Sequence, residues 1–265
     1  MLRVGINGIR GRMGQIILDF VLDSGHLLGA AFEHGSCPDI GKDISILIPK
    51  IKPSITINTI NENDFQNIDG IIDFTLPISS MEILDIAIKT NTPLVLGTTG
   101  FSDNEISKIE EASKHIPILF SPNMSVGVNL LFKLTEIVSK TLNSGFDVEI
   151  FEAHHRFKKD APSGTAKKLV DIVKNSINEL ADTTATYDRT GRTNERADNE
   201  IGVSVMRGGD IVGEHTVYFA GMGERIELTH RATSRQTFAR GAVIGLEYIV
   251  GKTPKLYSMF DVLGI

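Results

Sequence analysis

The chain has one cysteine among its 265 residues, few aromatic side chains and no long apolar run. Because Cys37 is alone, an intramolecular disulfide is excluded and a reducing compartment fits. Cysteine and histidine do not occur at metal-ligand spacing, so we expect no metal site. Tyrosine and phenylalanine are too sparse to form a platform for stacked bases. The apolar runs are too short for a membrane span or a signal peptide, which predicts a cytoplasmic protein.

The chain also lacks a net positive charge, since its formal net charge is -6. Proteins that bind nucleic acid need a basic surface to displace counterions, so we expect neither a nucleic-acid nor a membrane partner. One segment stands out against this acidic background. HHRFKKDAPSGTA (154–166) gathers two histidines, an arginine and two lysines in front of a polar triplet. Such a local cluster favours a small anionic ligand.

In the first half, short apolar runs alternate with amphipathic segments. Helices are predicted over 12–24, 79–90 and 103–115. Strands are predicted at 2–6, 27–32, 54–60, 69–75, 93–99 and 117–121. Strands alternating with helices of this length indicate crossover units and a parallel sheet.

The second half has a different pattern, which predicts a mostly antiparallel sheet. Apolar residues at helical spacing indicate helices over 125–143 and 163–181, and alternation indicates a strand over 145–155. Three further strands, separated by short turns, are predicted at 201–207, 214–220 and 224–232. A last helix is predicted over about 234–250, followed by a short strand at the C-terminus.

Three glycines, Gly8, Gly11 and Gly14, lie between the first strand and the first helix. Glycine lets the chain turn tightly and brings backbone N–H groups close to a pyrophosphate at the helix N-terminus. Glu33 follows Gly14 by 19 residues, where a carboxylate can accept a hydrogen bond from a ribose hydroxyl. The pattern predicts a dinucleotide site, and a plain strand–helix turn is the alternative.

The choice between NADH and NADPH stays open at this point. Glu33 favours a free 2′-hydroxyl, as in NADH. Arg10, Arg12 and His34 lie close enough in sequence to neutralise the 2′-phosphate of NADPH. We therefore expect NADH, NADPH or both.

The triplet Ser163, Gly164 and Thr165 follows Pro162 and predicts a helix N-terminus with both N–H and hydroxyl donors. One carboxylate hardly requires so many cations and donors, whereas a dicarboxylate does. Histidine, with an ordinary pKa of about 6.5, is suited to donate a proton near neutral pH. The alternative is that one histidine packs in the core and that the lysines are solvated.

Six blocks spread along the chain resemble the 4-hydroxy-tetrahydrodipicolinate reductase family, also called dihydrodipicolinate reductase. They are GIRGRMG (8–14), LGTTGF (96–101), SPNMSVGVN (121–129), EAHHRFKKDAPSGTA (152–166), RGGDIVGEHTVYF (207–219) and ERIELTHRATSRQTFARGA (224–242). The resemblance implies an oxidoreductase of lysine and diaminopimelate biosynthesis. It would reduce a cyclic dicarboxylate with hydride from NADH or NADPH, with loss of water.

The resemblance also implies roles for particular residues. His154 and Lys158 would carry the acid–base chemistry, and which of them is the final proton donor stays open. Substrate carboxylates would contact His155, Ser163, Gly164 and Thr165. The cofactor would contact Gly8, Ile9, Arg10, Gly11, Arg12, Met13, Glu33, His34, Gly97, Thr98, Thr99, Ser121, Pro122, Asn123 and Met124.

By the same resemblance, a Rossmann-like dinucleotide domain would comprise 1–125 and 234–265. A second α+β domain with a mixed sheet, 126–233, would bind substrate and form a homotetramer. The chain departs from many relatives at Phe157, where they carry a histidine, and at His34, where NADPH-competent relatives often carry arginine. Basic residues in the glycine loop, here Arg10, would compensate for His34, so we expect use of both cofactors with NADH somewhat favoured.

Other functions fit the sequence less well than this family. An aspartate-semialdehyde dehydrogenase needs a nucleophilic cysteine, and Cys37 lies in an early loop beside the expected adenosine end. A homoserine or sugar dehydrogenase would leave the Ser-Gly-Thr helix mouth unexplained. A non-enzymatic nucleotide sensor or redox regulator would bind without turnover, and the acidic chain has no DNA-binding footprint.

Overall fold

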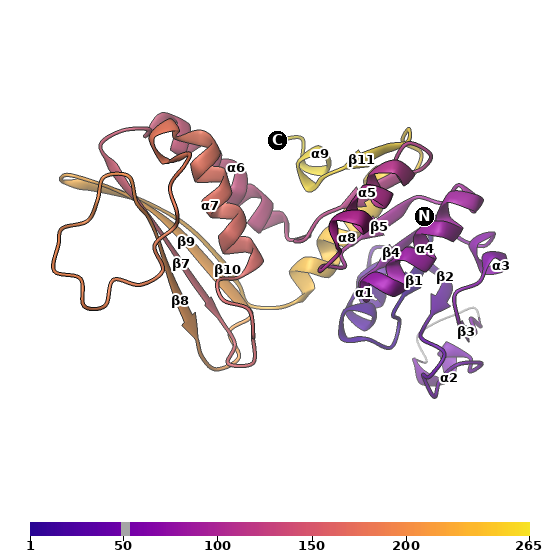
Figure 1. Ribbon diagram of the computed structural model, residues 1–265. Coiled ribbons are helices and arrows are strands. Elements are labelled where there is room, and N and C mark those ends of the chain that lie inside the picture. Colours follow the sequence, from indigo (N-terminus) through magenta and orange to yellow (C-terminus); the bar gives the residue numbers. More distant parts are fainter. Residues whose placement is uncertain (49–53) are drawn as a thin grey trace. The chain divides into compact units, whose positions relative to one another are not determined.

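A computed structural model describes residues 1–48 and 54–265 (Figure 1). The chain forms two compact units. One comprises 1–126 with 236–264, and the other comprises 127–235 with Ile265. Across the described residues, none of the helices is long and apolar enough to cross a membrane.

The first unit is built on a seven-stranded sheet in which every neighbouring pair is parallel. Its strands are β1 (Arg3–Asn7), β2 (Leu27–Phe32), β3 (Ile57–Asn58), β4 (Gly70–Asp73), β5 (Leu94–Leu96), β6 (Pro117–Phe120) and β11 (Lys255–Tyr257). They are arranged in the order β11-β6-β5-β4-β1-β2-β3. The predicted parallel sheet is therefore confirmed.

Helices cover both faces of this sheet, so successive residues of one strand enter different cores. The helices are α1 (Arg12–Asp23), α4 (Pro77–Thr90), α5 (Asp103–Ala112) and α8 (Gln236–Ile249), with the short α2 (Ile44–Leu47), α3 (Glu62–Phe65) and α9 (Met259–Leu263). Ile72 packs with α1 and α8 on one face, whereas Ile71 packs with α4 and α5 on the other. Because parallel strands end at the same edge, the loops after β1, β2, β4, β5 and β6 lie along one edge.

The second unit contains a four-stranded mixed sheet with the order β10-β9-β7-β8. Its strands are β7 (Phe146–His154), β8 (Ile201–Arg207), β9 (Gly213–Gly221) and β10 (Glu224–Ala232). The β10–β9 and β9–β7 pairs are antiparallel, while β7 and β8 are parallel because a crossover with helix α7 (Gly164–Ser176) joins them. Helix α7 packs against β7 and β9, and helix α6 (Val126–Thr141) precedes β7.

Two details differ from the sequence-based expectation. The helix expected over 163–181 ends at Ser176, because Ile177 takes an extended conformation (φ -120°, ψ 110°) before the 3-10 turn η1 (Asn178–Leu180). The short helices α2, α3 and α9 were not predicted, since four or five residues are too few to show a helical repeat.

Candidate functional site

The glycine turn of the first unit is shaped for the close approach of a ligand. Gly8 has φ +76°, and its N–H and that of Ile9 donate to the Phe32 carbonyl at 2.9 and 3.1 Å. A Cβ at Gly14 would lie 2.1 Å from the Gly8 carbonyl oxygen, so only glycine fits there. Helix α1 begins after Gly11, which has no side chain to accept from the first N–H groups. Those donors can bind an anion.

Glu33 lies beside this turn, directly after β2. Its Oε2 accepts from the Arg10 N–H at 2.9 Å and its Oε1 accepts from the His34 N–H at 3.1 Å. The imidazole of His34 turns back to its own loop, with Nδ1 2.7 Å from the Ser36 hydroxyl. The Arg10 side chain contacts Asp39, with Nε and Oδ2 2.8 Å apart.

A buried carboxyl group, Asp73, joins the loops that follow β1, β4 and β5. It accepts from Asn7 Nδ2 at 2.9 Å, from the Thr75 hydroxyl at 2.6 Å and from the Thr98 hydroxyl at 3.2 Å, and also from Ser80. Burial raises the pKa of Asp73 despite these bonds. The Asp73 carboxyl therefore links the turn containing Thr98 to Asn7, the residue that precedes the glycine turn. Sequence reasoning missed it.

The remaining predicted cofactor residues contribute in different ways. Ile9 and Met124 are buried in the core of the unit, so they can offer only backbone groups to a ligand. Ser121 accepts from the Asn123 N–H at 3.4 Å and donates to its carbonyl at 2.8 Å, which closes a tight turn. The exposed or partly exposed members of the predicted set are Gly8, Arg10, Gly11, Arg12, Met13, Glu33, His34, Gly97, Thr99, Pro122 and Asn123.

In the second unit, Glu152 and His154 are two residues apart on β7 and face the same side of the sheet. The register places Glu152 opposite His215 of β9, and His154 opposite Arg207 of β8. Four polar side chains from three strands therefore meet on one face.

Glu152 is fully buried, and both of its carboxylate oxygens accept hydrogen bonds. Its two oxygens accept from the Arg207 guanidinium at 2.8 and 2.9 Å, and from the Ser163 N–H at 2.9 Å. Oε2 also lies 2.5 Å from His154 Nδ1. Burial alone would raise the pKa of Glu152, but the bonds from His154, Arg207 and Ser163 outweigh it and lower the pKa to about 2. The carboxylate is charged at neutral pH.

This charged carboxylate orients the His154 ring. With Nδ1 directed at Glu152 Oε2, Nε2 is the nitrogen left to exchange a proton. Gly213 makes room for the ring, since a Cβ there would lie 3.1 Å from His154 Nε2.

His215 lies edge-on to His154, with ring centroids 5.2 Å apart. Its Nε2 is 3.1 Å from the hydroxyl of Ser163. Burial, with a smaller contribution from His154, lowers the pKa of His215 to about 3. His215 is therefore neutral near pH 7, and it orients Ser163 without adding charge.

Ser163 caps helix α7, its hydroxyl accepting from the Ala166 N–H at 3.2 Å. The next residues, Gly164 and Thr165, are exposed and half-buried, so donors at this helix N-terminus can reach a ligand. Lys158 and His155 are half-buried in the preceding loop, and Lys158 Nζ pairs with Asp160 at 2.9 Å.

The same loop carries Phe157, which is 78% exposed. Its ring lies 6.3 Å from that of His155, and the Arg156 guanidinium lies 5.9 Å from its centroid. Phe157 therefore offers an apolar surface beside a predicted substrate residue.

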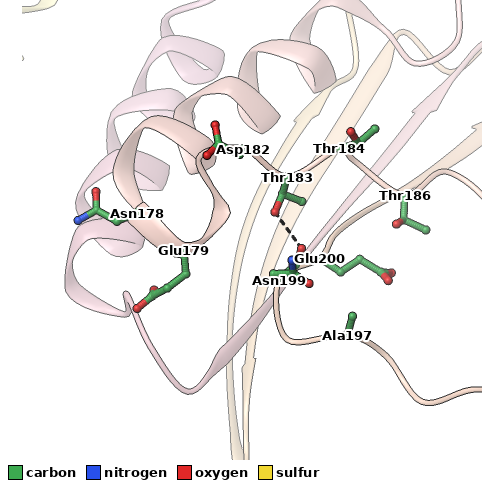
Figure 2. Close-up of a pocket in the computed structure, with 9 residues that line it drawn as sticks. All are labelled: Asn178, Glu179, Asp182, Thr183, Thr184, Thr186, Ala197, Asn199 and Glu200. Carbon is green, nitrogen blue, oxygen red and sulfur yellow. Dashed lines mark hydrogen bonds between the residues drawn. The ribbon is translucent and has the colours of Figure 1, made fainter.

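A cavity of about 330 Å³ lies elsewhere in the second unit (Figure 2). It is lined by Asn178, Glu179, Asp182, Thr183, Thr184, Thr186, Ala197, Asn199 and Glu200. Three carboxylates line it, and the predicted substrate residues are outside this set. A dianion would be repelled by these carboxylates. The N-terminus of α7, residues 163–165, which we call the α7 mouth, is therefore the better anion site.

Sequence reasoning missed Glu152, Arg207 and His215. Glu152 could have been found, because residues i and i+2 of a strand share a face and Glu152 stands two before His154. His215 could not have been found in this way, because its bond to Ser163 depends on strand pairing across 52 residues.

A Rossmann-like parallel sheet joined to a separate mixed-sheet unit is the architecture of a two-domain, nicotinamide-dependent oxidoreductase. Family comparison matches residues 2–124 to "Dihydrodipicolinate reductase, N-terminus" and residues 127–263 to "Dihydrodipicolinate reductase, C-terminus". The chain belongs to the dihydrodipicolinate reductase family, whose members use NADH or NADPH.

Individual relatives agree over the full length. The chain is 45% identical to the 4-hydroxy-tetrahydrodipicolinate reductase of Hahella chejuensis, covering 100% of both chains. It is 43% identical to that of Polynucleobacter necessarius, covering 100% of this chain and 99% of the relative. A dipicolinate-bound dihydrodipicolinate reductase from Paenisporosarcina sp. TG-14 has the same fold, with TM-score 0.76 and 24% identity over 98% of both chains.

Proposed function

We propose that the chain reduces 4-hydroxy-tetrahydrodipicolinate to tetrahydrodipicolinate with loss of water, in lysine and diaminopimelate biosynthesis. The observation that carries this proposal is the orientation of His154 by the buried Glu152 carboxylate, beside the α7 N-terminus. A dicarboxylate needs an anion site, and its reduction needs a proton donor. Both lie on adjoining segments of the second unit.

The first unit has the features that a nicotinamide dinucleotide requires. The glycine turn and the start of α1 would hold the pyrophosphate, and Glu33 would accept from the ribose. The turns at 97–99 and 121–124 would complete the site. When bound, the dinucleotide supplies the hydride.

The mouth of α7 would hold the substrate carboxylates. Gly164 and Thr165 offer backbone N–H groups, and Ser163 and Thr165 offer hydroxyls, where the helix dipole favours negative charge. His155 and Lys158 would add donors from the loop before the helix. Lys158 must exchange Asp160 for the substrate, which links substrate binding to a change of ion pair.

His154 would supply the proton next to the carbon that receives hydride. Glu152 stays charged, with its pKa at about 2, so it holds the ring in one orientation before and after proton transfer. Lys158, in the loop that follows β7, is the alternative proton donor.

We also propose that 1–125 with 234–265 acts as the dinucleotide domain and 126–233 as the substrate and oligomerisation domain, in a cytoplasmic homotetramer. Strand β10 carries mostly exposed side chains, including Ile226 at 39%. A second copy covering this sheet would explain the exposed apolar side chain. Sedimentation analysis should give four times the mass of one chain; a monomer would contradict this.

The test is a coupled assay. The preceding synthase generates substrate from pyruvate and aspartate semialdehyde, and loss of NADH or NADPH absorbance is followed. Oxidation that depends on the synthase would support the reductase, and the ratio of the two rates would give the cofactor preference. Protein that binds either dinucleotide but oxidises neither would contradict it.

A further inference from the structure

We propose that Asp39 is a specificity-determining residue that favours NADH over NADPH by holding Arg10 in an ion pair beside Glu33. This inference rests on the proposed assignment of Glu33 to the ribose of the dinucleotide. The two cofactors differ only in the 2′-phosphate of NADPH. Asp39 lies outside the glycine turn, six residues after Glu33.

The geometry begins with the Glu33 carboxylate. Because Glu33 Oε2 accepts the Arg10 backbone N–H at 2.9 Å, the Arg10 side chain starts next to the expected ribose position. A guanidinium there is the natural partner of a 2′-phosphate, which it can bind through two parallel hydrogen bonds.

The Arg10 guanidinium is instead paired with Asp39. Its Nε lies 2.8 Å from Asp39 Oδ2, and the other Asp39 oxygen binds Lys42 Nζ at 2.9 Å. The Asp39 side chain is only 14% exposed, whereas that of Lys42 is 50% exposed. A single carboxylate thus pairs with both Arg10 and Lys42.

The loop between β2 and α2 holds Asp39 in this position. Its backbone closes successive turns, with the Cys37 N–H donating to the His34 carbonyl at 2.8 Å and the Lys42 N–H donating to the Asp39 carbonyl at 3.1 Å. The ion pair with Arg10 therefore involves an ordered loop rather than a free side chain.

The local charge explains the expected preference. Glu33, Asp39, Arg10 and Lys42 sum to zero, and both cations are already paired. A 2′-phosphate would add a charge of about -1.5 to -2 beside two carboxylates and would have to compete with Asp39 for Arg10. A free 2′-hydroxyl needs only the Glu33 carboxylate.

The experiment measures dinucleotide binding without turnover, by titrating NADH and NADPH into the full-length protein and following nicotinamide fluorescence. Asp39→Asn should lower the ratio Kd(NADPH)/Kd(NADH) by about tenfold, equivalent to 1.4 kcal/mol. Asp85→Asn on α4 removes the same charge from an exposed position and should leave the ratio unchanged. Adenosine 2′,5′-bisphosphate, titrated calorimetrically, should gain affinity in D39N relative to adenosine 5′-monophosphate.

Arg10→Met shows whether Asp39 acts through Arg10. In the R10M background, D39N should move the ratio by much less than tenfold. The guanidinium that Asp39 holds is gone, and only the direct effects of removing the carboxylate and releasing Lys42 remain. An unchanged ratio in D39N, or the full shift persisting in R10M, would overturn the proposal. Failure of the native protein to bind either dinucleotide would overturn the cofactor assignment itself and the proposal with it. Binding without turnover would count only against the reductase reaction.

Discussion

Replacing Arg207 by methionine should destabilise the protein through the charge that it leaves behind. Glu152 is fully buried and accepts two bonds from Arg207, at 2.8 and 2.9 Å. Removing one partner of such a buried pair costs about 3 kcal/mol or more, because the remaining charge is uncompensated. The same change at Arg231, which is 66% exposed and pairs with Glu214 at 3.1 Å, should cost less than about 1 kcal/mol.

The double variant Glu152→Gln with Arg207→Met separates lost charge pairing from lost packing. It removes both charges, so it should be more stable than R207M alone. The assay is urea unfolding at pH 7.5, followed by far-ultraviolet circular dichroism because the chain has no tryptophan, at one protein concentration throughout. R207M within about 0.5 kcal/mol of the native protein, or a double variant less stable than R207M, would refute the reasoning.

Four further predictions concern other contacts in the two units. Burial lowers the pKa of His215 to about 3 in the folded protein. Below pH 6.5, His215 is therefore protonated in the unfolded chain but stays neutral in the folded protein. The free energy of unfolding should then fall by up to about 1.4 kcal/mol for each pH unit below 6.5. Urea unfolding at pH 7.5, 6 and 5 should show a smaller fall in His215→Gln than in the native protein. An equal fall in both proteins would contradict this prediction. Asp73→Asn should weaken NADH binding several-fold in a fluorescence titration. The amide has one acceptor oxygen where the carboxylate has two, and its NH2 group would face donors such as the Thr98 hydroxyl. Unchanged affinity would remove Asp73 from the site. Gly213→Ala places a Cβ 3.1 Å from His154 Nε2 and should lower kcat by about tenfold without changing NADH affinity. In the coupled assay, His154→Ala should lower kcat by about a hundredfold, whereas Thr165→Val should mainly raise KM for the substrate; two variants with native kinetics would exclude the α7 mouth.

Much of the first unit could be predicted because its signals are local. The strand, the glycine turn and the amphipathic helix from β1 to α1 follow one another in sequence, and Glu33 ends the next strand. Each signal depends on neighbouring residues and on the period of a strand or a helix. The same holds for the capped start of α7 at Ser163.

The second-unit network could not be predicted because it depends on register. Arg207 reaches Glu152 only because β8 pairs in parallel with β7, after a crossover of dozens of residues. The histidine at 215 reaches Ser163 only because β9 lies on the other side of β7. Sequence spacing says nothing about which of these side chains become neighbours, and Asp39 likewise acquires its significance from a contact with Arg10.

The most direct test of the account is a crystal structure of the protein with NADH and pyridine-2,6-dicarboxylate, a stable aromatic dicarboxylate. The account predicts a carboxylate at the α7 N-terminus, contacting Ser163, Gly164 and Thr165, with His154 Nε2 facing the ring. A dicarboxylate bound elsewhere in the second unit, with the α7 mouth holding only water, would contradict it.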